Sequence, residues 1–363
     1  MRGSAIFLND NLVSMNLRGM KRYFRAIIDG IVAALDSNVI VYSPEVRDYG
    51  TAKHIRSLQF GGQQPLRLNQ TIVSLVTRWE RAKVLFNAYY TNVFTQAAQV
   101  FTVYDMTPEL LPQYFDREHP GNRRFMAEKQ RCLEQAALVF SISERTARDA
   151  VAYYPQLDPA KIIVTPLGVD TFFLERNAHQ TTQQHKPFFL FVGHRMLQKN
   201  FARLLTAYKQ SGLAKDYDLR VISPGDFTPQ ESQEIHDLQL EESTYIFPAA
   251  SDTVLRESYS QATALVYPSE YEGFGLPILE AMASGTLVAT SNVSSMPEVG
   301  GDVALYFDPR DPDSITECLR QIAHLSTEKR ATRIEQGIAR ARTFTWARCQ
   351  CQTLQALKRL AGL

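Results

Sequence analysis

The sequence predicts an α/β protein built from two Rossmann-like domains, each with a parallel sheet. At 363 residues the chain is too long for one ordinary core, and two domains of about 150 to 200 residues are expected. A hydrophobic content of 45% is enough to fill two cores. Short apolar segments alternate with helical segments along the chain, which is typical of a parallel α/β sheet.

The first expected domain spans residues 1–174. It begins with the apolar segment Ala5–Leu8, which predicts a first strand and not a signal peptide. Gly19 then opens a segment whose apolar residues recur at helical spacing. We expect a variable loop over Tyr49–Leu68 and a helix N-cap at Ser143. The other expected elements are strands at Val39–Ser43, Lys83–Ala88, Gln99–Tyr104, Leu138–Ile142 and Ile162–Val164, and a helix at Asn122–Ala137.

A polar linker over residues 175–186 leads to a second expected domain over residues 187–343. The linker has no apolar period, which is typical of a connection between domains. We expect residues 344–363 to form a last helix that packs back on the first domain. Strands of the second domain are expected at Phe188–Gly193, Leu219–Ile222, Tyr245–Phe247, Ala264–Tyr267, Leu287–Ala289 and Ala304–Phe307.

The segment over residues 267–285 carries the strongest chemical signal in the chain. An apolar strand leads into a glycine-rich loop, and Pro277 stands where the first turn of a helix favours proline. Backbone N–H groups of Phe274, Gly275 and Leu276 lack helical partners in such a turn, and glycine lets a ligand approach closely. The segment therefore predicts an anion site, most simply for a phosphate.

Two carboxylates flank this expected anion site. Glu280 lies one turn inside the helix, and Glu272 lies on the loop before it. Acids beside a phosphate site suit hydroxyl groups, such as those of a ribose and a sugar. In the alternative interpretation the glycines only shape a turn, and both glutamates are solvated.

Glu272 and Glu280 have seven residues between them, which resembles the Glu-x7-Glu motif of family-4 retaining glycosyltransferases. The resemblance implies the GT-B fold, in which two Rossmann-like domains face a cleft. It also implies that Glu280 binds the ribose, that Glu272 acts on the sugar, and that Phe274, Gly275 and Leu276 bind the donor. Further segments that resemble family patterns are Pro166–Asp170, Pro297–Asp302 and Phe344–Trp346.

Two cations stand four residues apart in the loop after the first strand of the second domain. Arg195 and Lys199 precede a segment with helical periodicity, and this placement suits a diphosphate. In the family, an arginine and a lysine of this loop hold the donor diphosphate, so we expect both residues to be catalytic together with Glu272. The alternative is that they are two solvated surface charges.

Three positions of the first domain also resemble family features. Gly19 matches part of a glycine-rich loop that brings a backbone amide to the donor phosphate, or else it caps a helix without touching a ligand. Tyr104 and Asp105 follow an expected strand, at the end where parallel sheets bind ligands. Relatives often have a histidine where this chain has Tyr104. We expect these two residues to contact the sugar or acceptor, with capping of the next turn by Asp105 as the alternative.

The predicted function is a retaining hexosyltransferase that moves a sugar from a UDP- or GDP-sugar to a glycan, a glycolipid or another small acceptor. No metal is expected, because cations and helix N–H groups can neutralise the leaving diphosphate. One alternative is a catalytically silent nucleotide-sugar-binding partner subunit. The other is an enzyme of similar shape, either a nucleotide-sugar epimerase or a phosphorylase.

The charge balance and the cysteines limit the class of partner and the compartment. Lys and Arg total 39 against 38 for Asp and Glu, so the net charge of +1 gives no field that would recruit nucleic acid. The four cysteines lack the paired spacing of a zinc site, and we interpret them as reduced thiols in a cytoplasmic protein.

The sequence is compatible with peripheral contact at the inner face of a membrane. The sequence has no run of 18 apolar residues, so no spanning helix is expected. Basic and aromatic residues are mixed in Lys21–Arg25 and in Asn122–Phe125, which suits either an anionic membrane surface or an acidic acceptor. The alternative is a solvated helix face.

Overall fold

A computed structural model places the chain in two compact units. The first holds residues 1–168 and 346–363, and the second holds residues 169–345. The division falls before Val169, slightly earlier than the expected boundary after residue 174. The described residues are 6–10, 18–35, 38–45, 48–57, 66–175, 186–248 and 251–363. The expected linker over residues 175–186 therefore lies almost entirely outside them.

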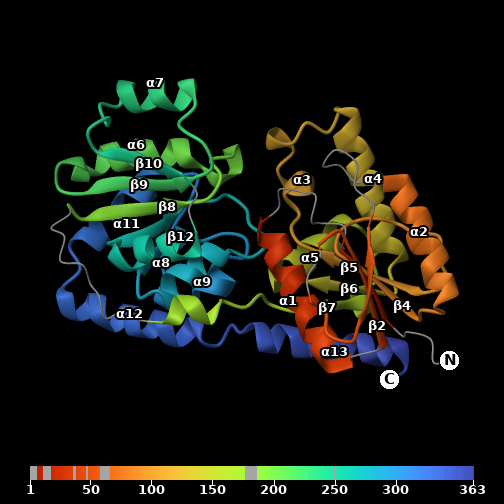
Figure 1. Cartoon of the computed structure of the whole chain (residues 1–363). Coiled ribbons are helices and arrows are strands. Elements are labelled where there is room, and N and C mark those ends of the chain that lie inside the picture. Colours follow the sequence, from red (N-terminus) through yellow and green to blue (C-terminus); the bar gives the residue numbers. More distant parts are fainter. Residues whose placement is uncertain are drawn as a thin grey trace. The chain divides into compact units, whose positions relative to one another are not determined.

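The first unit is built on a seven-stranded sheet in the order β3-β2-β1-β4-β5-β6-β7 (Figure 1). Every described strand pair in it is parallel, as the alternating pattern predicted. The central strands β1 and β4 are completely buried, because helices cover both faces of a parallel sheet. The strands are β1 (Ile6–Asn9), β2 (Val39–Ser43), β3 (Lys53–Arg56), β4 (Val84–Asn87), β5 (Ala98–Val103), β6 (Leu138–Ser141) and β7 (Ile162–Val164).

The segment 49–68, expected to be a variable loop, contains regular structure at both of its ends. β3 pairs with β2 at the edge of the sheet, and α2 begins at Leu66. The prediction was wrong there because β3 is short, half-exposed and polar, so it has no apolar alternation to detect. Residues 58–65 lie outside the described part.

The C-terminal helix α13 belongs to the first unit and packs along α1. Gln350 Nε2 donates to the Ala26 carbonyl over 2.7 Å. A Cβ at Gly30 would lie 2.6 Å from the Gln350 side chain, so glycine is needed for this approach. The helices of this unit are α1 (Arg18–Leu35), α2 (Leu66–Trp79), α3 (Thr107–Leu110), α4 (Pro120–Gln135), α5 (Glu144–Tyr153) and α13 (Trp346–Ala361).

The second unit has a six-stranded parallel sheet in the order β10-β9-β8-β11-β12-β13. It matches the expected strands with shifts of one or two residues at their ends. The strands are β8 (Phe188–Val192), β9 (Asp218–Ser223), β10 (Thr244–Pro248), β11 (Ala264–Tyr267), β12 (Leu287–Ser291) and β13 (Leu305–Phe307).

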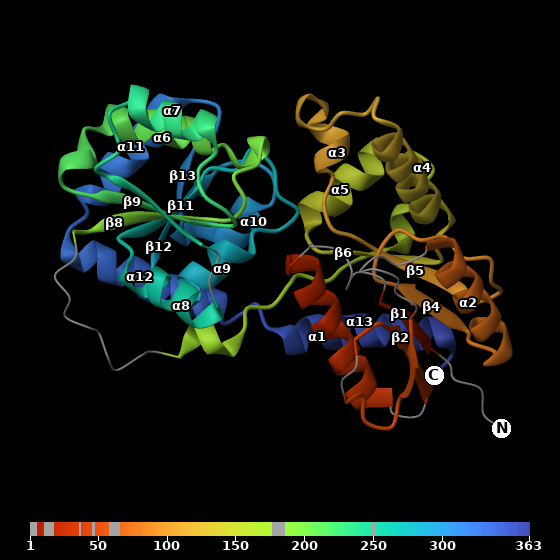
Figure 2. The same ribbon diagram turned by 45° about the horizontal axis from the view of Figure 1, so that its top comes forward.

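Helices cover both faces of this second sheet, with α6 and α7 on one side and α8 and α12 on the other (Figures 1 and 2). Phe189 and Phe191 of β8 are buried in the core that includes Leu204 and Leu205 of α6. The helices are α6 (Phe201–Ser211), α7 (Pro229–Asp237), α8 (Asp252–Gln261), α9 (Leu276–Ala283), α10 (Met296–Gly300), α11 (Pro312–Ala323) and α12 (Thr327–Ala341).

No helix in the described ranges is both long enough and apolar enough to cross a membrane. The two segments expected to mix basic and aromatic side chains differ in burial: the rings of the first are buried, and Phe125 of the second is half-buried. Tyr23 and Phe24 are buried in the core of the first unit. Phe125 stacks on Tyr89 with ring centroids 5.9 Å apart. These segments therefore offer arginines to solvent, but no fully exposed aromatic ring.

Candidate active site

The loop between β11 and α9 turns into the helix at Gly275, whose φ is 112°. Residues with a side chain rarely adopt this conformation, so glycine is required here. A Cβ at Gly275 would also lie 3.1 Å from Ile278 Cδ1. Pro277 lies in the first turn of α9, where its missing N–H costs no helical hydrogen bond. The strand, glycine turn and helix start are thus where the sequence placed them.

Two serines after β12 fix the shape of this loop, and sequence reasoning missed both. Ser294 Oγ accepts from the Glu272 N–H at 3.2 Å and donates to the Glu272 carbonyl at 2.7 Å. Ser295 Oγ lies 2.8 Å from the carbonyls of both Glu272 and Phe274. Because β12 is the neighbour of β11, its carboxyl end lies beside this loop. That neighbour relation is a property of the sheet order, which no local sequence pattern shows.

Glu280 is held rigidly inside the unit. It lies on α9 with only 6% of its surface exposed, and its Oε2 accepts a 3.1 Å hydrogen bond from the Tyr259 hydroxyl. Tyr259 comes from α8, which packs against α9. Burying a carboxylate costs free energy unless hydrogen bonds satisfy its oxygens. The Tyr259 hydroxyl supplies one such bond to Glu280.

Lys199 and Glu272 form an ion pair although they lie far apart in the sequence. Lys199 Nζ also lies 3.1 Å from the Tyr267 hydroxyl. Burial alone would lower the pKa of Lys199, but the Glu272 carboxylate and Tyr267 raise it above its ordinary value. Burial, with the nearby Glu272 charge, raises the pKa of Tyr267. The site therefore holds a charged ammonium beside a neutral phenol.

The sheet order explains why Lys199 meets Glu272. β8 and β11 are neighbours in the middle of the sheet. After β8 the chain adds β9 and β10 toward one edge, and β11, β12 and β13 then extend toward the other edge. Ligands in open parallel sheets bind at such a switch point, beyond the carboxyl ends of the strands. Lys199 follows β8, and Glu272 follows β11. The predicted lysine and glutamate therefore meet at the switch point of the second sheet.

Arg195 lies on the same loop as Lys199 but binds on the other side of β8. Its Nε donates to Glu231 at 2.8 Å, and its NH2 group donates to the Asp226 carbonyl at 2.6 Å. The guanidinium stacks over Phe227 at 5.4 Å, and its NH1 group is buried with no hydrogen-bond partner among the described residues. Arg195 and Lys199 thus have different carboxylate partners, Glu231 and Glu272. Their positions on one loop gave no indication of this difference.

In the first unit, the structure gives Tyr104 and Asp105 local roles. Tyr104 is buried, and its hydroxyl donates to the Ala88 carbonyl at 2.7 Å. Burial and the neighbouring Tyr23 raise the pKa of Tyr104. Asp105 Oδ1 accepts from the Thr107 N–H at 3.2 Å, which is the turn-capping alternative. Gly19 is exposed in the first turn of α1.

A buried ion pair beneath Asp105 was not expected. Lys129 and Glu109 pair at 2.8 Å with side chains that are almost completely buried. Lys129 Nζ also donates to the Asp105 carbonyl at 2.7 Å, and the Tyr154 hydroxyl donates to Glu109 at 2.5 Å. These bonds connect α3, α4 and α5 to the loop after β5. They fix the backbone that carries Asp105.

The switch point of the first sheet lies between β1 and β4 and carries two amides, while the buried Asp10 carboxylate beside them is bound by Ser43 Oγ of β2. Asn9 Nδ2 donates to Asn87 Oδ1 at 2.7 Å at the ends of these strands. Asn87 Nδ2 is buried without a hydrogen-bond partner in the part of the chain that the structure describes. Sequence reasoning missed both residues, because a single asparagine after a strand is also a common turn residue.

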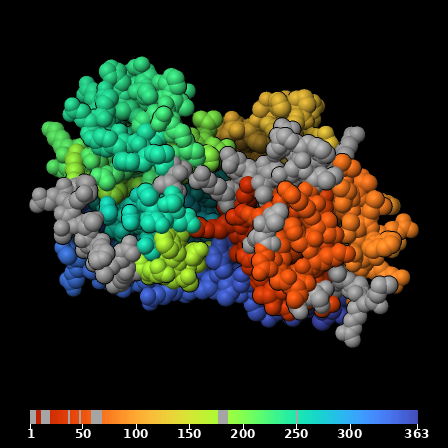
Figure 3. All heavy atoms as spheres, in the orientation of Figure 1, coloured from red at the N-terminus to blue at the C-terminus, as the bar shows by residue number. Residues whose placement is uncertain are grey.

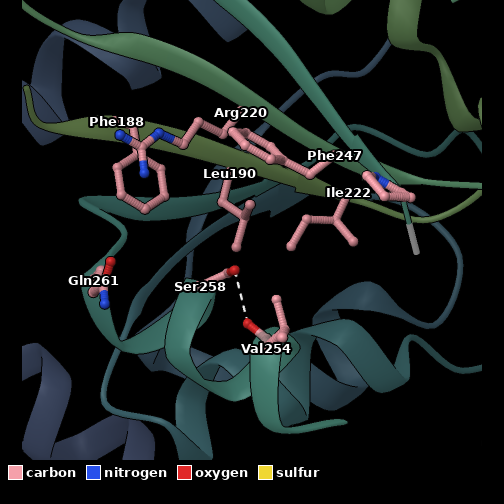
Figure 4. Close-up of a pocket in the computed structure, with 9 residues that line it drawn as sticks. Phe188, Leu190, Arg220, Ile222, Phe247, Val254, Ser258 and Gln261 are labelled. Atoms are coloured by element: carbon pink, nitrogen blue, oxygen red, sulfur yellow. Dashed lines mark hydrogen bonds between the residues drawn. The ribbon is translucent and has the colours of Figure 1, made fainter. Parts of the chain in front are cut away.

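A separate cavity of about 200 Å³ lies between the second sheet and α8 (Figure 4). Arg220 covers one wall, with its guanidinium 4.0 Å from the Phe188 ring centroid. The predicted donor residues are not among its described lining residues, which are Phe188, Leu190, Arg220, Ile222, Phe247, Pro248, Val254, Ser258 and Gln261.

The chain contains two Asp-x-Asp sequences, a typical metal signature that the prediction of a metal-free site wrongly took to be absent. Asp311 Oδ1 accepts from the Asp313 N–H at 3.0 Å and so caps α11. In the other, Asp216-Tyr217-Asp218, the Asp218 carboxylate pairs with Lys186 at 3.1 Å. The described ranges contain no group of three or more His, Cys, Asp or Glu side chains arranged to hold a metal ion.

Comparison with known proteins identifies similar chains. Residues 174–340 match the family described as glycosyl transferases group 1. The chain is 31% identical over 277 residues to O-antigen chain mannosyltransferase B of Escherichia coli, covering 72% of this chain and 70% of the relative. It is 26% identical over 347 residues to alpha-maltose-1-phosphate synthase of Mycolicibacterium smegmatis, covering 87% and 89%.

The fold is shared with solved structures at low sequence identity. Sucrose-phosphate synthase of Thermosynechococcus elongatus superposes with a TM-score of 0.81 and 17% identity, over 99% of each chain. A likeness at this identity concerns the fold alone.

Proposed function

Because this chain belongs to the group 1 glycosyl transferases, we propose that it moves a hexose with retention from a UDP- or GDP-sugar to a glycan or glycolipid acceptor. The observation that carries the proposal is the Lys199–Glu272 pair at the switch point of the second sheet. It places one cation and one carboxylate beside a glycine turn and a helix N-terminus. A diphosphate and a sugar need these groups.

Lys199 is proposed to neutralise the leaving diphosphate together with the amides of Phe274, Gly275 and Leu276. Its ammonium stays charged, because Glu272 raises its pKa. When the donor enters, its phosphates replace Glu272 as the partner of Lys199. Negative charge grows on the diphosphate as the glycosidic bond breaks, so the cation stabilises the transition state more than the bound donor.

Glu272 and Glu280 are proposed to bind different parts of the donor. Glu280, buried and held by Tyr259, accepts hydrogen bonds from the ribose hydroxyls. Glu272 leaves Lys199, accepts from sugar hydroxyls and supports positive charge at the anomeric carbon. The acceptor oxygen bonds to that carbon on the face from which the diphosphate departs, and the acceptor proton leaves with the diphosphate.

Arg195 is proposed as the second cation for the diphosphate. Its buried NH1 group without a partner among the described residues gives it one free donor position. Its bonds to Glu231 and the Asp226 carbonyl hold the guanidinium plane in place. No metal is required if the two cations and the helix N–H groups share the charge.

The first unit is proposed to bind the acceptor at the carboxyl edge of its sheet. Asn9 and Asn87 at its switch point are neutral hydrogen-bonding groups, which suit sugar hydroxyls. The geometry favours a structural role for Tyr104, whose hydroxyl is committed to Ala88. Gly19 and the side chain of Asp105 remain proposed contacts for the donor and the acceptor.

A thermal-shift panel with UDP, GDP, ADP and dTDP tests the donor assignment. The matching nucleotide at 100 times its Kd is expected to stabilise the protein by about 2.7 kcal/mol. Donor hydrolysis then separates the alternatives. A silent partner subunit would bind the nucleotide without turnover, and an epimerase would convert the sugar without releasing the diphosphate. Release of nucleoside diphosphate with retained sugar configuration supports the proposal.

A further inference from the structure

Four exposed large apolar side chains of the first unit lie on or beside one helix. Leu68, Leu75 and Trp79 of α2 are 44%, 64% and 83% exposed, and Phe94 is 95% exposed. These four residues are called the α2 surface. Single exposed apolar residues are ordinary on proteins, but a group that includes an almost completely exposed tryptophan and phenylalanine indicates an interaction site.

Leu68, Leu75 and Trp79 form one apolar stripe on α2, and Phe94 lies on a neighbouring loop that is fastened to the same helix. Leu68, Leu75 and Trp79 are seven and four residues apart, so they lie on one side of α2, while Val73 and Thr77 face the core. Two hydrogen bonds fasten the loop that carries Phe94 to this helix. Ser74 Oγ donates to the Phe94 carbonyl, and Gln70 Nε2 donates to the Asn92 carbonyl at 3.2 Å.

The charge on α2 itself has one sign, and Glu128, which binds the Asn92 N–H near Phe94, is paired with Arg131. α2 contains no aspartate or glutamate, and Arg78 is exposed beside Trp79. The next acid along the chain, Glu80, is neutralised by an ion pair with Lys53. Arg81 follows with its side chain exposed as well. An apolar face bordered by arginines complements a partner with an apolar interior and negatively charged groups around it.

We propose that the α2 surface rests in the head-group layer of an anionic lipid bilayer. Trp79 and Phe94 have the amphipathic or apolar rings that favour the membrane interface, and Leu75 enters the acyl boundary between them. Arg78 and Arg81 bind lipid phosphates. In Figures 1 and 2, α2 lies at the flank of the first sheet, and the orange atoms that include it form an outer face in Figure 3.

This surface differs from the two segments that the sequence suggested for membrane contact. The aromatic rings of Lys21–Arg25 are buried, and Phe125 is half-buried against Tyr89, so neither segment presents a fully exposed ring. On α2 the rings are outside. The inference does not depend on the proposed reaction, because it concerns residues outside the candidate active site.

Vesicle binding with a fluorescent reporter tests this inference on the full chain. The sequence has two tryptophans, so a Trp346→Phe background leaves Trp79 as the only reporter. Vesicles of phosphatidylglycerol and phosphatidylethanolamine are expected to shift its emission to the blue and to co-sediment the protein. Phosphatidylcholine vesicles are expected to bind far less.

The variants separate the apolar and the charged contributions. With Trp346 intact and sedimentation as the readout, Trp79→Ser and Phe94→Ser are each expected to weaken partitioning on the order of tenfold. Arg78→Gln is expected to weaken it about fivefold on anionic vesicles only. Leu363→Ser is the matched control, because Leu363 is also half-exposed in this unit, and it should bind normally.

Two results would overturn the inference. The first is that the intact chain does not bind anionic vesicles, or that Trp79→Ser binds them as well as the intact chain does, while circular dichroism shows that both proteins are folded. The other is a concentration-dependent dimer, seen by light scattering, that Trp79→Ser abolishes while anionic vesicles leave the Trp79 emission unchanged. The second result would assign the α2 surface to another copy of the chain.

Discussion

The two sheets share a topology, but their switch points carry different chemistry. In the second unit, β8 and β11 bring a cation, a carboxylate and a phenol together as Lys199, Glu272 and Tyr267. In the first unit, β1 and β4 bring together the uncharged amides Asn9 and Asn87. Charge suits a diphosphate that must leave, whereas amides suit neutral hydroxyls.

Charge in the first unit is used for architecture instead. Glu109 and Lys129 are almost completely buried and tie three helices to the loop after β5. In the second unit the charged pair keeps 15–18% of its side-chain surface exposed. A pair that must exchange partners with a ligand needs access to solvent, but a structural pair does not.

Removal of the buried cation is expected to have the largest effect, and it should affect stability. Lys129→Met leaves Glu109 charged and buried without its partner, which costs about 3–5 kcal/mol in such pairs. Nucleotide affinity should be retained, because the residues proposed to bind the nucleoside diphosphate, apart from Gly19, lie in the other unit. Urea denaturation and nucleotide titration measure the two quantities.

The control for that experiment is Lys53→Met, which breaks an exposed pair with Glu80 in the same unit. Exposed pairs contribute about 0–1 kcal/mol, so this variant should unfold almost normally. If Lys129→Met is as stable as Lys53→Met, the buried pair is not architectural and the contrast between the units fails.

Removal of the cation at the second switch point should instead affect turnover. Lys199→Ala is expected to lower the rate about 10²- to 10³-fold, the scale for losing one preorganised group that stabilises a developing anion. Donor affinity should fall less, because the diphosphate gains charge only as the bond breaks. Steady-state kinetics in excess EDTA measures this, and activity should persist there.

Lys209→Ala is the matched control, since Lys209 is an exposed lysine at the end of α6. Its kinetics should be normal. Near-normal turnover in Lys199→Ala would show that the leaving group is neutralised elsewhere. Activity that EDTA abolishes and Mg²⁺ or Mn²⁺ restores would show that a metal does it.

The two glutamates should separate nucleotide binding from transfer. Glu280→Ala removes the buried carboxylate that is proposed to accept hydrogen bonds from the ribose. Loss of a hydrogen bond to a charged group typically corresponds to about a 10- to 100-fold weaker nucleotide affinity. Glu272→Ala should keep the free nucleotide and lower sugar transfer. Isothermal titration with the nucleoside diphosphate, paired with a transfer assay, compares them. Equal losses of nucleotide affinity would contradict the division of roles.

The sequence predicted the two parallel-sheet domains of the GT-B fold correctly, and it placed the local features of the donor loop. The turn at Gly275 and the helix start at Pro277 depend on residues within a few positions, so their chemistry is visible in the chain. Every strand of the second sheet was placed for the same reason, since each contains a short apolar run, although the edge strand β10 is largely exposed.

Partners that come from neighbouring strands were not predictable in this way. Ser294 and Ser295 hold Glu272 because β12 lies beside β11, and Glu231 holds Arg195 because β9 lies beside β8. A polar edge strand such as β3 also has no apolar alternation to detect. The roles of the predicted site residues stay predictions, which the variants above address.

The smallest expected effect concerns the other side of β8, where Arg195 meets Glu231. Burial acts to raise the pKa of Glu231, but hydrogen bonds from Arg195 and the Thr228 backbone lower it overall. A depressed carboxyl pKa contributes stability above the unfolded value of about 4.3, and that contribution disappears as the pH falls through the folded pKa. Glu231→Gln removes the charge but keeps an oxygen that can accept from Arg195, so it should cost about 1 kcal/mol at neutral pH.

The pH dependence distinguishes this pair from the one at the switch point. The difference in unfolding free energy between the intact chain and Glu231→Gln should shrink as the pH falls below about 4. The raised pKa of Lys199 has the opposite consequence, because its contribution is complete below about 10.4 and is lost only as the pH rises through the folded pKa. Glu234→Gln on the same helix is the control. Burial raises the pKa of Glu234, so its replacement should not destabilise at neutral pH. Denaturation of the three proteins from pH 3 to 8 measures this, and a pH-independent difference for Glu231→Gln would show that the Arg195 pair contributes packing and not charge.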